Sequence, residues 1–178
     1  MSFPHKPFRG QIYRFEHLAA FTMPLALDAQ SKIVLPMHVS FSAHCFTEVF
    51  DTLRHQPEHR YTYASELRAF DEQRHALSLQ LPALVQAIAA RKVNFTRENN
   101  YLLVEQQNLA GQLDNYAVFF DLVKDKTGKG LRMYVQSAYV KAALPKSLDA
   151  IRFRILAAAL WEGRRVHSPQ IKQHAKLK

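Results

Sequence analysis

The clearest pattern of hydrophobic and polar positions is a strict alternation over residues 37–45. Apolar side chains hold the odd positions from Met37 to Cys45. The even positions carry the polar side chains His38, Ser40, Ser42 and His44. Because successive side chains of a strand point to opposite faces, this alternation predicts a β-strand with one buried and one polar face. Pro36 cannot donate to a sheet, so we expect it at the start of the strand or at an edge.

Three more strands are predicted in the second half of the chain, over residues 101–107, 116–124 and 131–140. The connections between them, residues 108–115 and 125–130, contain the Asn, Asp and Gly residues that are typical of turns. Short connections favour antiparallel neighbours, so the three segments predict a β-meander.

Helical spacing of apolar residues predicts three helices. The first covers residues 63–76, the second begins near Pro82, which is tolerated in a first turn, and the third follows Ser147 as N-cap. Gly163 is the expected stop of the last helix. The fold class is therefore α+β: an antiparallel β-meander packed against a few helices, with a C-terminal helix. We expect a single domain over residues 1–163 and a basic, flexible tail over 164–178.

Composition favours a folded protein of a reducing compartment. Of the 178 residues 48% are hydrophobic, which suffices for a core, and the one cysteine, Cys45, cannot form an intrachain disulfide. The apolar run 18–27 is interrupted by Pro24 and is too short to span a membrane. It also lacks a clean cleavage site for a signal peptide. We therefore expect a soluble cytoplasmic protein with no membrane anchor.

The net charge of +9 is unevenly distributed. Residues 151–178 contain seven basic residues and one acidic residue, Glu162. Such a field attracts polyanions such as RNA, DNA or an acidic protein. A solvated tail that only aids solubility explains the same charges equally well.

Catalytic chemistry is best placed on the polar face of the strand over 37–45. Same-face neighbours lie roughly 7 Å apart along a strand, so Ser42 and His44 can act on one substrate. Histidine holds both protonation states within reach at neutral pH, which suits a general acid or base. The alternative is an amphipathic strand whose polar face meets water. Cys45 belongs to the apolar face, where burial makes a thiol inert.

A metal site is not predicted, although the chain has nine histidines. The candidate ligands for zinc are His44, Cys45, His55, His59 and His75. His44 and Cys45 point to opposite faces of the predicted strand, and Pro57 disfavours a helix that would join His55 to His59. His55 and His59 flank this loop, so we expect both to be poorly positioned for catalysis. No cofactor is predicted either.

Basic residues suggest where a polyanion would bind. Lys124, Lys126 and Lys129 surround the turn of a predicted hairpin, whose tip can grip phosphates without reading sequence, or can simply be solvated. On the third meander strand Arg132, Tyr134 and Gln136 share one face, where arginine can hold a phosphate and tyrosine can stack on a base. Ser137 and Tyr139 are assigned to the other face. The basic tail adds Arg164 and Arg165.

The order of these elements resembles the barnase/EndoU/colicin/RelE-like group, which is often met in phage-associated and toxin proteins. The resemblance covers about residues 60–140. It is carried by Arg74 and His75 before the segment 78–82, and by the segments 101–105, 116–120 and 131–139. It implies metal-independent cleavage of RNA, with basic and hydroxyl groups on the sheet.

Two functions remain open at this point. The first is an RNase-like enzyme, with His44 as general acid or base, Arg74 as the cation that stabilises the phosphate, and Tyr139 as a weaker candidate proton donor. The second is a non-catalytic module that binds nucleic acid or an acidic protein through Arg132 and the basic C-terminal segment.

Overall fold

A computed structural model describes residues 2–28, 30, 32–96, 101–109, 112–143, 149–164 and 166. Within strands β9 and β10 it describes the backbone of residues 106–109 and 112–114 but not their side chains.

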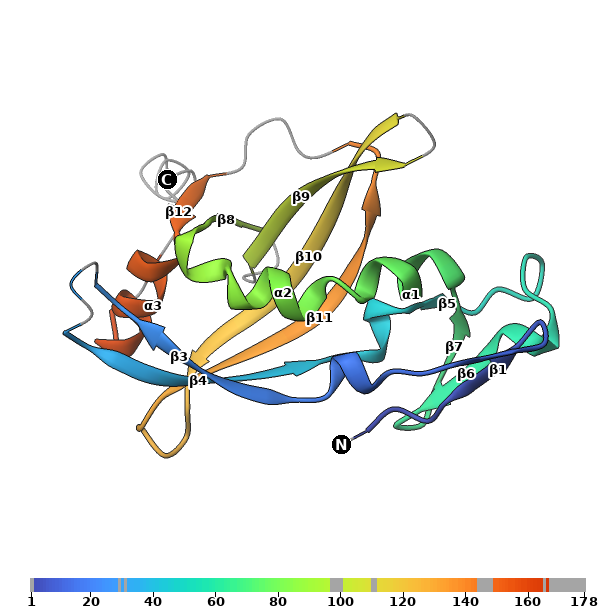
Figure 1. The fold of residues 1–178 in the computed structure, drawn as a ribbon, viewed down its shortest axis with the longest axis horizontal. Coiled ribbons are helices and arrows are strands. Elements are labelled where there is room, and N and C mark those ends of the chain that lie inside the picture. The colour runs from blue at the N-terminus through green and yellow to red at the C-terminus, as the bar shows by residue number, and fades with distance from the viewer. Residues whose placement is uncertain are drawn as a thin grey trace, which may run out of the picture.

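The centre of the fold is a seven-stranded sheet in the order β12-β8-β9-β10-β11-β4-β3 (Figure 1). The strands are β3 (Phe21–Ala26), β4 (Val34–Phe41), β8 (Lys92–Phe95), β9 (Tyr101–Leu109), β10 (Gln112–Lys124), β11 (Leu131–Lys141) and β12 (Ala150–Arg152). All neighbours are antiparallel except β4 and β11, which are parallel. The predicted α+β class and the meander β9–β10–β11 are confirmed.

Two smaller groups of strands, formed by the N-terminal half of the chain, flank this sheet. A three-stranded sheet has the order β5-β7-β6, and a separate hairpin joins β1 to β2. Their strands are β1 (Lys6–Phe8), β2 (Gln11–Tyr13), β5 (Thr47–Val49), β6 (Arg60–Tyr63) and β7 (Glu66–Phe70). The apolar run near the N-terminus forms β3 and pairs with β4. No helix in the described parts of the chain is long and apolar enough to cross a membrane.

Short helices cover one face of the large sheet (Figure 1). They are α1 (Glu72–Ser78), α2 (Leu81–Gln86) and α3 (Phe153–Trp161). The chain also forms the 3-10 turns η1 (Glu16–Leu18), η2 (Ala43–Cys45), η3 (Pro57–His59) and η4 (Ile88–Ala90). Helix side chains Val85, Ile88 and Phe153 are buried in one cluster with Tyr116 and Phe120 of β10. Pro82 lies in the first turn of α2, and Gly163, with φ of +73°, ends α3, both as predicted.

The helix predicted over residues 63–76 is wrong for its first half. Residues 60–70 form the hairpin β6–β7, and only Glu72–Ser78 is helical, capped by the Asp71 carboxylate, which accepts from the Arg74 amide at 2.9 Å. The hairpin turn places Ala64 and Ser65 at φ of +48° and +68°. Two-residue turns of this kind usually contain Asn or Gly, so neither residue signals the turn in the sequence.

The last helix also begins later than predicted. Residues 150–152 pair with β8 as strand β12, and the helix starts at Phe153. The predicted N-cap Ser147 lies outside the described residues. So do Arg165 and residues 167–178, and the flexible basic tail therefore stays a prediction.

Close packing fixes β11 beside β4. A Cβ atom on Gly130, just before β11, would lie 2.3 Å from the backbone oxygen of Pro36. Glycine is therefore required where the β10–β11 turn meets β4. Pro36 itself lies inside β4 and not at its start, opposite Pro24 of the edge strand β3.

Candidate functional site

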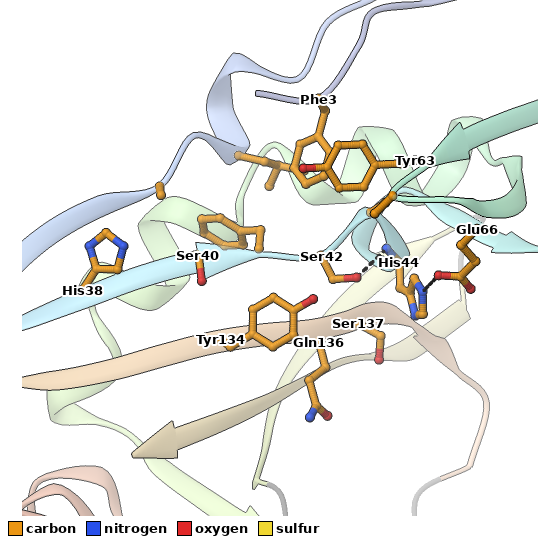
Figure 2. A pocket seen from close by; sticks show the side chains of 15 residues that line it. Phe3, His38, Ser40, Ser42, His44, Tyr63, Glu66, Tyr134, Gln136 and Ser137 are labelled. Carbon is orange, nitrogen blue, oxygen red and sulfur yellow. Dashed lines mark hydrogen bonds and ion pairs between the residues drawn. The ribbon is translucent and has the colours of Figure 1, made fainter. Parts of the chain in front are cut away.

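A cleft of about 780 Å³ opens where the large sheet meets the β6–β7 hairpin (Figure 2). Strands β4 and β11 form its floor, and Phe3 and Tyr63 form a wall on the opposite side from Tyr134. The polar lining comes from His38, Ser40, Ser42, His44, Glu66, Gln136 and Ser137. The cleft thus combines flat aromatic surfaces with titratable and hydroxyl groups.

The polar face predicted over residues 37–45 is correct up to Phe41 and wrong beyond it. Met37, Val39 and Phe41 are buried, while His38 and Ser40 face away from the core. Strand β4 ends at Phe41, because the Ser42 hydroxyl accepts a hydrogen bond from the His44 amide at 3.1 Å and caps the turn η2. His44 therefore sits on a 3-10 turn and not on a strand. It still lines the same cleft as His38, Ser40 and Ser42.

His44 is held by a carboxylate at the end of this cleft. Its Nε2 lies 3.0 Å from Oε2 of Glu66, and both side chains are partly open to solvent, at 37% and 53% exposure. The hydrogen bond from His44, and a second from Arg68, hold the pKa of the Glu66 carboxyl below its ordinary value. An ionised Glu66 selects the tautomer with hydrogen on Nε2, which leaves the Nδ1 lone pair of His44 to accept a proton. Within the described part of the chain, this Nδ1 makes no hydrogen bond.

Buried Arg68 holds Glu66 through the carboxylate oxygen that does not contact His44. Its Nη1 donates to Oε1 of Glu66 at 2.8 Å, and its Nε donates to the Thr47 hydroxyl at 2.7 Å. The Thr47 hydroxyl in turn donates to the Ala43 carbonyl at 2.7 Å, next to His44. Glu66 and the η2 turn are therefore held to the same buried guanidinium.

A second histidine–carboxylate pair lies outside the cleft. His55 Nε2 is 2.7 Å from Oε1 of Glu48, and its Nδ1 accepts from the Asp51 amide at 2.9 Å. The His55 side chain is only 7% exposed. His55 is therefore held firmly by β5 and the turn that follows it, and not loosely as its place beside Pro57 suggested. Both of its ring nitrogens are already bonded within the protein.

Arg74 and Tyr139, the other two candidate catalytic residues, contact each other away from the cleft. The Arg74 guanidinium lies 5.0 Å from the centre of the Tyr139 ring, and Nη1 donates to the Thr47 carbonyl at 2.7 Å. The other neighbour of Tyr139 is the stacked ring of Phe119. Neither Arg74 nor Tyr139 lines the cleft that contains His44. These contacts connect α1 to β5 and to the large sheet, so Arg74 and Tyr139 stabilise the fold.

A β-bulge changes which face Ser137 and Tyr139 occupy. Phe119 pairs with Ser137 but Phe120 pairs with Val135, so Gln136 is an extra residue in β11. The extra residue brings Ser137 onto the face of Tyr134, where it lines the cleft. Tyr139 also turns to this face and meets Phe119 there. The assignment of these two residues to the opposite face was wrong.

Some of the predicted basic residues are bonded to other groups of the protein, and others are exposed to solvent. Lys124 donates to the Trp161 carbonyl at 3.1 Å and lies over the Trp161 ring, and Arg164 pairs with Glu162 at 2.6 Å. Lys126, Lys129 and Arg132 are exposed. Arg132 borders a hollow, next to Tyr134.

Cys45 is fully buried, as the alternation predicted. Burial raises the pKa of its thiol to about 12, so the thiolate is absent at neutral pH. Within the described residues, no group of three or more His, Cys, Asp or Glu side chains is arranged to hold a metal ion.

Sequence reasoning missed Glu66, Phe3 and Tyr63. Glu66 falls within the helix predicted over residues 63–76, and only the β6–β7 hairpin brings it to His44 across 22 positions of sequence. Phe3 reaches the cleft from the N-terminal segment, which showed no interpretable pattern. No local signal in the sequence marks any of the three.

Comparison with known proteins gives one match. The model of the YjaZ family matches residues 5–161, which cover the whole described fold up to the end of α3. No curated protein and no solved structure matches the chain. The match does not bear on the resemblance to the barnase/EndoU/colicin/RelE-like group.

Proposed function

Since the chain belongs to the YjaZ family, whose description names no reaction, we propose a function from the cleft itself: metal-independent cleavage of single-stranded RNA, with His44 as the general base. The observation that carries this proposal is the His44–Glu66 pair, which leaves one ring nitrogen of an accessible histidine without a hydrogen bond within the described structure. A partly exposed imidazole that is oriented by a carboxylate is suited to proton transfer at neutral pH.

In this proposal Nδ1 of His44 takes the proton of a ribose 2′-hydroxyl. The 2′-oxygen then attacks the neighbouring phosphorus, and the bond to the 5′-oxygen of the next nucleotide breaks. Glu66 stabilises the imidazolium that forms, and Arg68 keeps Glu66 in place. The open cleft admits water, which gives a proton to the leaving oxygen, and the hydroxide that remains takes the proton back from Nδ1 of His44. Tyr134 and Tyr63 supply aromatic surfaces for the bases.

Arg74 and Tyr139 have no part in this mechanism, since both lie outside the cleft. His38 on the floor of the cleft is six residues before His44, so it lies beside a neighbouring phosphate of the strand and not beside the one that is attacked. The net charge of +9 favours approach of a polyanion.

A second function, binding of nucleic acid without cleavage, is favoured by one specific observation. Among the residues that the structure describes, no lysine or arginine lines the cleft around His44. Enzymes that cleave phosphodiesters usually place a cation against the phosphate, and its absence next to His44 suits a binding module better.

Incubation of the purified protein with total RNA in EDTA separates the two functions. Cleavage produces fragments that end in a 2′,3′-cyclic phosphate, and these increase with protein concentration. Intact RNA with retarded mobility supports the binding module. RNA that is neither cut nor retarded rules out both functions.

A further inference from the structure

A smaller hollow of about 280 Å³ continues from the cleft along the sheet. It shares Ser40 and Tyr134 with the cleft and is otherwise lined by Asp121, Val123 and Arg132. The strand register explains this grouping. Tyr134 of β11 lies directly between Asp121 of β10 and Ser40 of β4, and Arg132 is the preceding residue on the same face.

Two opposite charges flank the Tyr134 ring without pairing with each other. Asp121 accepts one hydrogen bond through Oδ2, from Nε2 of Gln136 at 2.5 Å. Among the described residues no ion pair joins Asp121 or Arg132 to any partner. As diagonal neighbours on antiparallel strands, their Cα atoms are separated by about 7–8 Å, which leaves room for a flat ligand between the side chains.

Tyr134 offers this ligand a surface on which to stack. Its side chain lies in both hollows and is 41% exposed, although it is a large aromatic residue. Val123, also exposed, adds an apolar contact at the same place. Stacking on an exposed tyrosine is a common way to hold the unpaired base of a single strand.

Guanine is the base that satisfies both charges at once. Its O6 and N7 accept two hydrogen bonds from a guanidinium, while its N1–H and its 2-amino group donate two to a carboxylate. Adenine presents no donor at N1, cytosine offers a carboxylate its single amino group, and uracil offers one N–H. We propose that the hollow of Asp121, Arg132 and Tyr134 binds a guanine of the RNA strand in the cleft, an inference that rests on the proposed function.

Binding of labelled 2′-O-methyl pentanucleotides tests this specificity without cleavage. The oligonucleotides are UUGUU, UUAUU, UUCUU and UUUUU, and affinity is measured by fluorescence anisotropy. We expect the first to bind at least about tenfold more tightly, the range that one well-formed bidentate base contact provides. Asp121→Asn and Arg132→Gln should each bring guanine within about threefold of adenine. Glu162→Gln, a matched loss of a carboxylate directly after α3, should leave the preference unchanged.

Failure of this inference is distinct from failure of the proposed function. Equal affinity for the four oligonucleotides, in a protein that still cuts total RNA, overturns the guanine site and leaves the function standing. If nothing is bound and nothing is cut, both are overturned. Should Asp121→Asn not fold, the 5′ and 3′ ends of the wild-type fragments decide: ends clustered beside guanine support the site, and ends without base preference overturn it.

Discussion

Two histidine–glutamate pairs of nearly the same geometry are built into different surroundings. His44 and Glu66 meet at the end of an open cleft, whereas His55 and Glu48 meet in a buried turn. His55 uses both ring nitrogens within the protein, while the described residues leave Nδ1 of His44 without a partner. A histidine–carboxylate contact alone therefore does not identify a site, and the second ring nitrogen separates a reactive histidine from a structural one.

The largest expected effect is on RNA cleavage by variants of the two histidines. His44→Ala should reduce the rate by at least about 100-fold, the lower end of what acid–base catalysis contributes. His55→Ala should stay within a few-fold of wild type when it is assayed below its melting temperature. Gel assays with labelled RNA in EDTA measure both rates. Normal cleavage by a folded His44→Ala protein would show that the base lies elsewhere.

Stability should change in the opposite order. His55→Ala leaves the Asp51 amide without its acceptor and the half-buried Glu48 with its exposed partner Arg54, so we expect a loss of about 2–3 kcal/mol in the free energy of unfolding. His44→Ala removes only a partly exposed pair and should cost less than about 1 kcal/mol. Urea denaturation followed by circular dichroism measures both values. A larger loss for His44→Ala would reverse the structural roles assigned to the two pairs.

A third histidine, His17, makes its hydrogen bond to a serine and gives a smaller effect. Its Nε2 lies 2.8 Å from the Ser78 hydroxyl, and burial, with His75 nearby, lowers its pKa from 6.5 to about 4. The unfolded chain therefore binds this proton at a higher pH than the folded one. The contribution of His17 to stability is complete above pH 6.5 and is lost as the pH falls towards 4.

We expect this loss to be about 1–2 kcal/mol, after allowance for the partial exposure of the ring. Melting temperatures of wild type and His17→Gln between pH 7 and pH 4 measure it. The variant should lose less stability on acidification than wild type, and parallel curves would contradict the assignment to His17.

The smallest expected effect concerns two basic residues near the β10–β11 turn. Lys129 is exposed and open to a phosphate, whereas Lys124 is occupied by Trp161. Lys129→Gln should reduce the slope of log affinity against log salt by about 0.7 for single-stranded RNA, and Lys124→Gln should leave it nearly unchanged. Anisotropy titrations over a salt series measure the slopes. Equal reductions would place both side chains on the nucleic acid.

Regular patterns in the sequence predicted the meander, the helix at Pro82 and the buried face of β4. Each depends on local alternation or spacing that later packing does not disturb. The hairpin β6–β7 was missed because Ala64 and Ser65 adopt a turn that their side chains do not signal. Strand β12 was missed because its three residues are specified by β8 and not by their own pattern.

The site was predictable only in part, for related reasons. His44, Ser42 and Arg132 stood out as polar residues at regular positions. Glu66 is identified as a site residue only by its contact with His44, which the fold creates. The bulge at Gln136 decides on which face Ser137 and Tyr139 lie. An insertion of one residue in a strand reverses every later side chain, so alternation alone cannot predict it.

The most direct test of the central claim follows the histidine rings themselves. Long-range ¹H–¹⁵N spectra of the ring nitrogens are recorded while the protein is titrated with a 2′-O-methyl RNA that it cannot cleave. If RNA lies in the cleft against Nδ1 of His44, the His44 resonances shift in proportion to occupancy while those of His55 stay in place. RNA that binds and leaves the His44 resonances unmoved would contradict the claim that this cleft acts on RNA.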